Sequence, residues 1–316
     1  MVAKIFIDGE AGTTGLQIRE RLAGRRDLEI LSIDPDKRKD LAERQRLLNA
    51  ADVAILCLPD DAAKESVSLI ENDTTRVIDA STAHRVAEGW AYGFAEMDRG
   101  QSARIAAAQR VGNPGCWPQG AIATLRPLIA AGLIPADYPV TVHGISGYSG
   151  GGKAMIADYE AAGDAANEFM PYGLSFRHKH LPELQVYAGL AHTPLFNPAV
   201  GNFAQGMLTL VPLQLWTLAK VPSGRELHAA IADHYAGIAD SFVEVAPFAA
   251  EERSAELDPE RYNGTNRMRL HVFANDERAQ ATLVAVYDNL GKGASGAAVQ
   301  NLNLMLGVAA DTSLAA

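Results

Sequence analysis

Short apolar runs alternate with helix-forming stretches along the first third of the chain. Four of these runs, each bounded by polar or turn-forming residues, predict buried strands at Lys4–Ile7, Leu28–Ile33, Asp52–Leu58 and Arg76–Ile78. Between them, Ile18 and Leu22 lie one helical turn apart, and residues 41–50 are rich in helix formers. Strands that alternate with helices predict an α/β fold with a doubly wound, Rossmann-like parallel sheet.

Two-residue alternation replaces this pattern further along the chain. It predicts strands at Leu208–Leu215, Ser241–Val245, Arg267–Phe273 and Thr282–Tyr287. In the third of these runs, Met268, Leu270 and Val272 are expected to face one side, and Arg269 and His271 the other. Such alternation indicates a second, α+β domain whose mixed or antiparallel sheet has one wetter face.

Helical spacing returns near the end of the chain. From about Asn289 onward, Val299, Leu302 and Leu306 recur so that they share one face of a helix.

Composition narrows the class of protein. The chain has 316 residues, of which 48% are hydrophobic and 21% charged, so it has material for a large core and two domains. A net charge of −10 gives no basic footprint for nucleic acid, and no polybasic patch for a membrane stands out. Two cysteines suit a reducing cytosol. The start of the chain, MVAKIFIDGE, reaches an acid too soon for a signal peptide, and no apolar run is long enough to span a bilayer. We therefore expect a cytoplasmic protein without nucleic-acid or membrane partners.

A glycine-rich loop follows the first predicted strand. Gly9, Gly12 and Gly15 are three apart, a spacing of G-x-x-G-x-x-G rather than the commoner G-x-G-x-x-G. Glycines at this place let the backbone approach a pyrophosphate, whose charge the following helix N-terminus favours. The hydroxyls of Thr13 and Thr14 are candidates for further phosphate hydrogen bonds. A dinucleotide site is favoured over a plain strand–helix turn because of the position of the loop.

The end of the second predicted strand carries two opposite signals. Asp34 is an acid where NAD-binding proteins hold the ribose 2′-hydroxyl. Lys37, Arg38 and Lys39 follow, and such cations pair with the 2′-phosphate of NADP. The residues themselves leave NAD and NADP equally open.

Cys116 is the candidate nucleophile. It follows the turn-forming residues 113–115 and precedes an apolar helical period that continues to a stop at Gly132, with Pro118 suited to the first turn. A thiol at a helix N-terminus is stabilised as the thiolate by the helix dipole and the unpaired N–H groups, which can also hold an oxyanion. The alternative, a small buried hydrophobe, fits Cys57 in its apolar run better than Cys116.

A thiol beside a nicotinamide needs a general acid–base. His178 and His180 alternate as on a strand, so that both face one side, and Glu183 is placed to orient one of them. A zinc site is the competing reading of His-x-His, but a further ligand at metal spacing is missing nearby, and no metal is expected.

A second glycine-rich passage leads from a predicted strand into a helix. Ser149 and the three glycines after it offer free N–H groups, and Lys153 supplies a cation. Such a loop fits an anion, and a flexible surface hinge is an equal alternative.

Five motifs, spread over nearly the whole chain, carry a resemblance to a known family. They are the glycine loop Gly9–Gly15, the cysteine motif Gly112–Trp117, Ser146–Gly150, the histidine motif His178–Glu183, and the C-terminal Gly291–Asn301. With these motifs the chain resembles the N-acetyl-gamma-glutamyl-phosphate reductases of arginine biosynthesis, in their shorter form. The cysteine and histidine motifs are specific, whereas aspartate-semialdehyde dehydrogenases share the glycine loops.

The resemblance implies a chemistry and the residues for it. Cys116 would displace phosphate from an acyl phosphate, NADPH would reduce the resulting thioester, and His180, or else His178, would move the protons. It also implies NADP(H), with the adenosine 2′-phosphate near Arg38 and Lys39. Further contacts come from Gly293 and Asn301 to the cofactor and from Arg85, Ser149, Lys153 and Glu183 to the substrate.

The same resemblance implies the domain organisation. The last helix would return to the first domain, so that residues 1–115 and about 290–316 bind the dinucleotide, while about 116–289 carry the catalytic and oligomerisation functions. The uncovered sheet face would join subunits of a homo-oligomer, a dimer or tetramer.

Two departures from the family pattern indicate a subgroup. Gln119 stands where many members have threonine, and Thr82-Ala83-His84-Arg85 replaces a more usual Ala-Asp-Phe-Arg. The histidine motif favours an N-acylated gamma-glutamyl phosphate as the substrate. A dehydrogenase for aspartate or aminoadipate-type semialdehydes and a non-catalytic NADP sensor are the alternatives; the sensor has no use for a nucleophilic Cys116.

Overall fold

The computed structural model describes residues 2–248 and 257–315, which form two compact units. Unit 1 comprises residues 1–95, 100–115 and 294–315, and unit 2 comprises residues 96–99 and 116–293 within these described limits. Among the described residues, no helix combines the length and the apolar character needed to cross a membrane.

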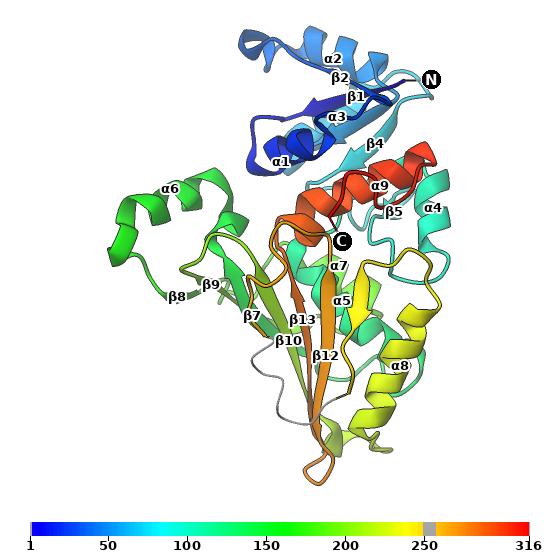
Figure 1. Ribbon diagram of the computed structural model, residues 1–316, viewed down its shortest axis with the longest axis vertical. Coiled ribbons are helices and arrows are strands. Elements are labelled where there is room, and N and C mark those ends of the chain that lie inside the picture. The colour runs from blue at the N-terminus through cyan, green and yellow to red at the C-terminus, as the bar shows by residue number, and fades with distance from the viewer. Residues whose placement is uncertain (1, 249–256, 316) are drawn as a thin grey trace. The chain divides into compact units, whose positions relative to one another are not determined.

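Unit 1 is an α/β unit with six strands in one sheet (Figure 1). Its strands are β1 (Ala3–Asp8), β2 (Leu28–Leu31), β3 (Val53–Leu56), β4 (Arg76–Asp79), β5 (Ala91–Tyr92) and β6 (Arg110–Gly112). Its helices are α1 (Thr13–Leu22), η1 (Pro35–Lys37), α2 (Leu41–Ala50), α3 (Asp60–Ser68), α4 (Gln101–Ala107) and α9 (Gly296–Leu306). The four strands and the helices predicted from periodicity are confirmed, although β2 and β3 are shorter than the apolar runs that predicted them.

The strand order β2-β1-β3-β4-β6-β5 is parallel throughout. Because the order reverses at β1, the carboxyl ends of β1 and β3 flank a topological switch point, where sheets of this type bind ligands. Two apolar clusters cover the sheet, one on each face. Ile18, Ile105 and Val299 bring α1, α4 and α9 into the first cluster, while Leu47 and Ala63 bring α2 and α3 into the second.

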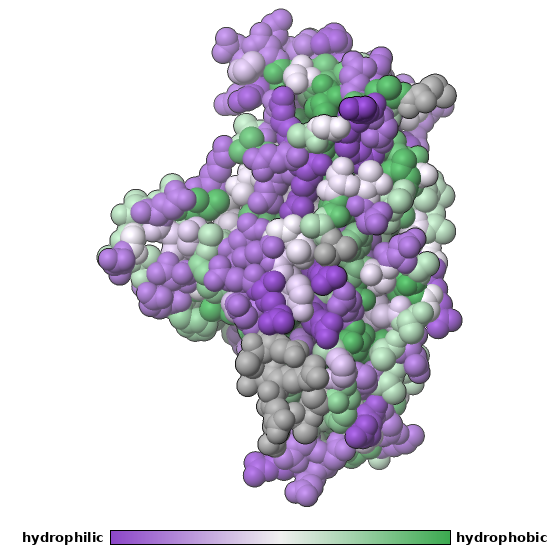
Figure 2. All heavy atoms as spheres, viewed as in Figure 1, coloured by the Kyte–Doolittle hydropathy of each residue, from purple (hydrophilic) through white to green (hydrophobic). Residues whose placement is uncertain are grey.

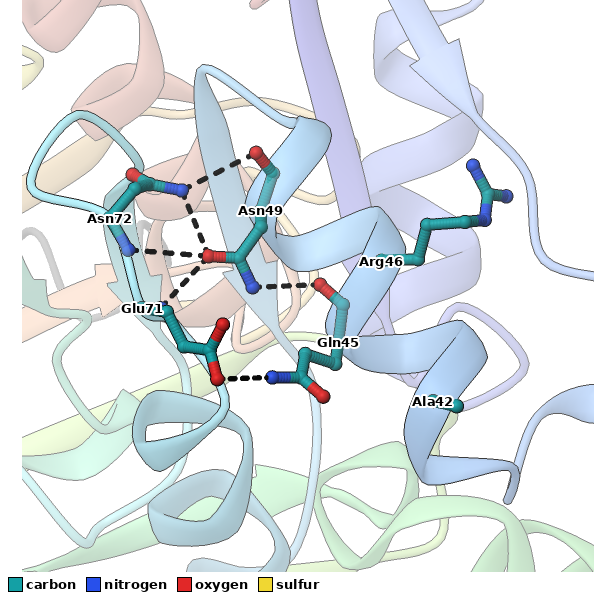
Figure 3. Close-up of a pocket in the computed structure, with 6 residues that line it drawn as sticks. All are labelled: Ala42, Gln45, Arg46, Asn49, Glu71 and Asn72. Atoms are coloured by element: carbon teal, nitrogen blue, oxygen red, sulfur yellow. Dashed lines mark hydrogen bonds between the residues drawn. The ribbon is translucent and has the colours of Figure 1, made fainter.

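Polar contacts close the edge of this second layer. The Asn49 side chain on α2 donates to the Gln45 carbonyl and accepts from the N–H groups of Glu71 and Asn72, as Figure 3 shows. The Gln45 amide in turn donates to Glu71 over 2.7 Å. The shallow pocket between these residues contains none of the predicted site residues. Its polar groups hold α2 to the chain that follows α3.

Unit 2 contains a seven-stranded sheet. Its strands are β7 (Thr141–Gly147), β8 (Phe169–Pro171), β9 (Leu195–Gly201), β10 (Met207–Gln214), β11 (Val243–Val245), β12 (Met268–Asn275) and β13 (Gln280–Tyr287). Its helices are α5 (Cys116–Ala130), η2 (Tyr148–Gly151), α6 (Gly152–Ala162), η3 (Gly163–Ala165), α7 (Leu181–Ala188), η4 (Leu215–Thr217) and α8 (Gly224–Ala236), followed by a π-helical turn, η6 (Gly291–Ser295), that runs into unit 1.

The sheet order is β11-β12-β13-β10-β7-β9-β8, with parallel pairs β11–β12 and β7–β9 and antiparallel pairs elsewhere. The predicted mixed sheet is therefore confirmed. Residues of β10 alternate between buried and partly exposed along its length. Helices α5 and α8 pack against the buried face, and α6 projects from the sheet of its own unit (Figure 1). Hydrophilic residues predominate on the face of the molecule in Figure 2.

One expectation for unit 2 is wrong. His178 and His180 do not lie on a strand: Gly173 and Phe176 have positive φ angles of 67° and 56°, and the chain turns into α7, whose second residue is Pro182. His271 lies on the predicted face of β12 with Arg269 and Phe273, although it is itself only 3% exposed and stacks on the Phe273 ring at 6.0 Å.

Candidate active site

Cys116 is the first residue of α5 and is partly exposed. The predicted helix is confirmed, with Pro118 in its first turn and Gly132 just beyond its end, at a φ of 68°. Tyr287 on β13 donates its hydroxyl to the Cys116 carbonyl over 2.6 Å and accepts from the Gly120 N–H over 3.2 Å. Burial raises the pKa of Tyr287, so the hydroxyl stays protonated as a donor. The first turn of α5 is thereby fixed from the sheet.

A second support reaches Cys116 from the segment after β13. A Cβ placed on Gly293 would lie 3.0 Å from the Cys116 Cβ, so a larger residue there would push Cys116 by a few tenths of an ångström. The Gln119 amide donates to the Lys292 carbonyl over 2.7 Å. The Lys292 ammonium, 1% exposed, pairs with the equally buried Glu96 carboxylate at 2.7 Å. Gly293, predicted to contact the cofactor, is thus packed against the nucleophile.

An aromatic layer connects the start of α5 with the histidine motif. Trp117 donates through its indole N–H to the Tyr172 hydroxyl over 3.0 Å, and Tyr172 contacts His178 edge-on at 5.8 Å. Phe196 packs against both Trp117 and His178. Burial, and next to it the negative charge of a Cys116 thiolate, raises the pKa of Tyr172, which shows that this layer lies within electrostatic reach of Cys116.

The two histidines meet at 4.7 Å between ring centroids even though no strand holds them. The backbone N–H of His180 donates to Nδ1 of His178 over 3.2 Å, and His180 then caps α7. His178 therefore uses Nδ1 as an acceptor, and a proton on that atom would break this hydrogen bond. Glu183 lies in the first turn of α7, and His180 is the N-cap residue of the same helix. The Glu183 side chain is buried, with 1% exposed.

The second glycine-rich passage has the predicted order of strand and helix, as β7, η2 and α6. Ser149 is buried, and its hydroxyl accepts from the Asn289 amide over 3.1 Å. Lys153 is exposed on α6, a helix with no buried residue. Only Ser149 of this pair is tied into the body of unit 2.

The glycine loop of unit 1 lies at the switch point and fits a dinucleotide. Gly9 has a φ of 88°, and a Cβ there would lie 2.4 Å from the Cys57 carbonyl oxygen. A Cβ on Gly15 would lie 2.7 Å from the Gly9 oxygen. Thr13 and Thr14 begin α1, whose N-cap Gly12 makes no side-chain cap, so the N–H groups of this helix start can bind phosphate.

A cavity of about 560 Å³ opens beside this loop within unit 1. Gly9, Arg38 and Lys39 are among the residues that line it, whereas Lys37 and Asp34 are not. The Asp34 carboxylate accepts instead from the Asp36 N–H over 3.0 Å and caps η1. Arg38 and Lys39, and not Asp34 at the strand end, therefore line the cavity beside the glycine loop, and such cations pair with the 2′-phosphate of NADP.

Two predicted contacts in unit 1 are engaged in holding the cysteine motif. Arg85 donates from Nε to the Asn113 carbonyl and from Nη2 to the Ala80 carbonyl. Asn301 donates to the Asn113 side chain over 3.0 Å, while its own buried Oδ1 has no hydrogen-bond partner among the described residues. An amide donor on a bound cofactor would satisfy that oxygen.

Cys57 lies in surroundings that disfavour its thiolate. Burial of the thiol, followed by the charges of Asp79 and Asp8, raises the pKa of Cys57 to about 12. Such a thiol is not a nucleophile near neutral pH. Within the described residues, no group of three or more His, Cys, Asp and Glu side chains could hold a metal ion.

Comparison with known proteins decides the family. Residues 4–105 match the family described as semialdehyde dehydrogenase, NAD binding domain, and residues 116–289 match semialdehyde dehydrogenase, dimerisation domain. An N-acetyl-gamma-glutamyl-phosphate reductase of Chelativorans sp. is 74% identical over 97% of this chain and 99% of its own length, and one of Mesorhizobium japonicum is 71% identical over 98% and 100%. The chain belongs to the semialdehyde dehydrogenase family, among the N-acetyl-gamma-glutamyl-phosphate reductases.

Solved semialdehyde dehydrogenases share the fold. Aspartate semialdehyde dehydrogenase II of Vibrio cholerae aligns with a TM-score of 0.70 at 14% identity, over 97% of this chain and 98% of its own. The enzyme of Candida albicans aligns with a TM-score of 0.65 at 14% identity, over 99% of this chain and 100% of its own. The predicted Rossmann-like sheet with a second, mixed-sheet unit is therefore the fold of this family.

Sequence reasoning missed the residues that support the semialdehyde dehydrogenase site. Tyr172, Phe196 and Tyr287 lie 56 or more positions from Cys116 in the chain, and no local spacing connects them with it. Gly120 is the one signal that was available. A glycine in the first helical turn costs stability unless something approaches closely, and Tyr287 does so here.

Proposed function

We propose that the protein catalyses the NADPH-dependent reduction of N-acetyl-gamma-glutamyl phosphate to N-acetylglutamate 5-semialdehyde and phosphate, a step of arginine biosynthesis. The 74% identity with a reductase of that name, across 97% of the chain, supports the substrate. The partly exposed Cys116 at the first residue of α5 supports the covalent chemistry and is the observation that carries the proposal.

Cys116 is the proposed nucleophile. The thiolate attacks the acyl carbon, a C–S bond forms, and the C–O bond to phosphate breaks, which leaves a thioester on Cys116. The N-terminus of α5 stabilises the thiolate before attack and the oxyanion during it. The Tyr287 hydroxyl holds the backbone that presents the sulfur, and Gly293 packs against it.

The glycine loop, Arg38 and Lys39 would hold the cofactor, which when bound would supply the hydride that reduces the thioester. A proton must then reach the oxygen of the resulting thiohemiacetal, or leave it when the aldehyde is released. We assign this proton transfer to His180, because Nδ1 of His178 is occupied by the His180 backbone N–H. Glu183 in the same first turn is proposed to orient the imidazole.

The substrate's anionic groups need donors. Ser149 in the η2 turn, Lys153 and Arg85 are the proposed contacts, as the family resemblance implies. Arg85 donates to the carbonyls of Asn113 and Ala80, which keep its guanidinium beside the cysteine motif.

We also propose that unit 1 is the dinucleotide-binding domain, that unit 2 is the catalytic and oligomerisation domain, and that the protein is a cytoplasmic homo-oligomer. Leu208 and Leu210, partly exposed on one face of β10, support a subunit contact there. Two free cysteines support a reducing compartment. Light scattering after size exclusion tests the assembly: a wild-type dimer or tetramer that Leu210→Arg dissociates is expected, and a wild-type monomer would contradict the proposal.

The reaction run in reverse tests the substrate. NADP, phosphate or arsenate, and N-acetylglutamate semialdehyde should give NADPH, whereas aspartate semialdehyde should react far less well. The N-acyl group removes the charge of the amino group, so a pocket built for one substrate leaves polar groups unpaired with the other. Comparable efficiency with aspartate semialdehyde would refute the substrate assignment and leave the thioester chemistry intact.

A further inference from the structure

The glycine loop of unit 1 contains an acid, which is unusual for a site that must accept phosphates. Glu10 is the second residue of the Gly9–Gly15 loop, and its side chain is only 10% exposed. Arg19 on α1 forms a short ion pair with its Oε2 atom. Arg38 lies 3.7 Å from Oε1 and is itself 45% exposed. The carboxylate therefore has one tight and one loose cationic partner.

The loose partner is the arginine that the cofactor needs. Arg38 and Glu10 both line the cavity of about 560 Å³ beside the loop. Three acids and three bases line it in all, so its charge is balanced: Asp8, Glu10, Glu65, Arg38, Lys39 and Arg44. Arg44 is engaged with Asp8 and Glu65. Glu10 is the acid that remains to oppose Arg38 and Lys39.

The acid at the end of β2, which in many NAD-binding folds binds the adenosine ribose, makes a different contact in this chain. Asp34, at the end of β2, accepts from the Asp36 N–H and caps η1, and it does not line the cavity. In NAD-binding folds an acid near this place accepts from the ribose 2′-hydroxyl. In this chain Glu10 is the carboxylate within reach of Arg38 that could do so.

We propose that Glu10 sets the cofactor preference of this protein, by competing with the 2′-phosphate of NADP for Arg38. The 3.7 Å contact, on a half-exposed side chain, is weak enough to be exchanged for a phosphate. Arg19 keeps Glu10 in place after Arg38 has left. Glu10 then lowers the affinity for the 2′-phosphate and remains available as a hydroxyl acceptor, which keeps NADH in use as a weaker cofactor.

Calorimetric titration of the full chain with two adenosine nucleotides tests this directly, without turnover. Adenosine 2′,5′-bisphosphate and 5′-AMP differ only in the 2′-phosphate, so the ratio of their dissociation constants isolates its contribution. Glu10→Gln keeps the size of the side chain and removes the charge. It should tighten bisphosphate binding about tenfold, equivalent to about 1.4 kcal/mol, and leave 5′-AMP within about twofold. An unchanged ratio in Glu10→Gln would overturn the proposal.

Asp34→Asn is the matched control. Like Glu10→Gln, this change removes one carboxylate charge, here just after β2, and asparagine can still cap η1. The ratio should stay at the wild-type value. If Asp34→Asn raised the ratio as much as Glu10→Gln, a general charge effect would explain both, and Glu10 would lose its assigned role.

A double-variant cycle separates competition for Arg38 from repulsion through space. Arg38→Ala alone should weaken bisphosphate binding, and adding Glu10→Gln to it should recover little. A full gain from Glu10→Gln in the absence of Arg38 would refute the competition. Binding of 5′-AMP by each variant, at the wild-type affinity, shows that the loop is folded.

The inference rests on the proposed use of NADP(H), and the two fail in different ways. If the wild-type protein bound the bisphosphate no better than 5′-AMP, the cofactor assignment itself would be wrong. If the wild-type protein favoured the bisphosphate but Glu10→Gln did not change that preference, only the role of Glu10 would be wrong.

Discussion

The Tyr287 hydroxyl bridges the carbonyl of Cys116 and, through its oxygen, the N–H of Gly120, over 2.6 and 3.2 Å. A regular α-helix joins these two backbone groups directly. The side chain of a distant strand therefore takes part in the helical turn that carries the nucleophile. Gly120 makes this possible, because a Cβ there would lie 2.8 Å from the ring and the hydroxyl.

Removing that hydroxyl should disturb the nucleophile more than the fold. In Tyr287→Phe the Cys116 carbonyl loses its donor, and the free energy of unfolding should fall by about 1–2 kcal/mol. The sulfur would move relative to the acyl carbon, so kcat should fall by roughly tenfold to a hundredfold. The rate of Cys116 alkylation by iodoacetamide, followed against pH, should fall as well.

Tyr235→Phe is the control for this change. Tyr235 is buried too and donates to the Ala123 carbonyl of the same helix over 2.8 Å. Its loss should cost similar stability but leave the alkylation of Cys116 unchanged. If both variants slowed alkylation equally, the position of Tyr287 at the first turn would have no special effect.

Cys116 and Cys57 should differ in their reactivity and in the effect of their removal. Cys116→Ala should abolish turnover and spare NADPH binding, because the thiolate forms the thioester. Cys57→Ala should keep turnover and lose about 1 kcal/mol of stability. Since the pKa of Cys57 is raised to about 12, iodoacetamide at pH 8 should label Cys116 alone, as peptide mass mapping would show. Wild-type turnover in Cys116→Ala would refute the mechanism.

Arg38 should matter for NADPH more than for NADH. Arg38→Ala removes a charge-assisted contact to the 2′-phosphate, so KM for NADPH should rise about tenfold and KM for NADH by less. Lys37→Ala is the matched control, because Lys37 carries the same charge one residue away but does not line the cavity. Equal effects of Arg38→Ala on both cofactors would remove Arg38 from the site.

The two histidines should differ in kind. His180→Asn should lower kcat by roughly a hundredfold or more, the range for loss of a general acid–base, with little change in stability. His178→Ala should lower the melting temperature instead, because the His180 N–H loses its Nδ1 acceptor. If kcat of His180→Asn still changed with pH near the pKa of a histidine, as in the wild type, the proton transfer would belong to another group.

Local patterns predicted most of the secondary structure that positions the site. The apolar runs of the first third predicted β1 to β4. A strand that is buried on both faces is apolar along its whole length and shows no polar alternation. The glycine loop is at the switch point because it follows the first strand. Cys116 begins α5 because turn residues precede it, and an apolar helical period with Pro118 in its first turn follows.

The histidine motif shows where local reasoning fails. Two-residue spacing fits a strand, but Gly173 and Phe176 adopt positive φ angles and Pro182 starts a helix. The rings still meet, because the turn carries its own hydrogen bond from His180 to His178. Spacing alone could not distinguish these two ways of placing both rings together.

The sequence by itself determined which residues carry reactive groups and which elements begin beside them, because propensity, periodicity and turn chemistry act over a few positions. It also determined the family, through motifs that extend over the whole chain. Tertiary structure alone decided what each group contacts: Tyr287 on Cys116, Trp117 on Tyr172, and Arg38 near Glu10. These contacts join residues that are far apart in sequence, and they form only when sheets and helices pack. The raised pKa of Cys57 arises in the same way, since burial and neighbouring charges, and not the thiol itself, set it.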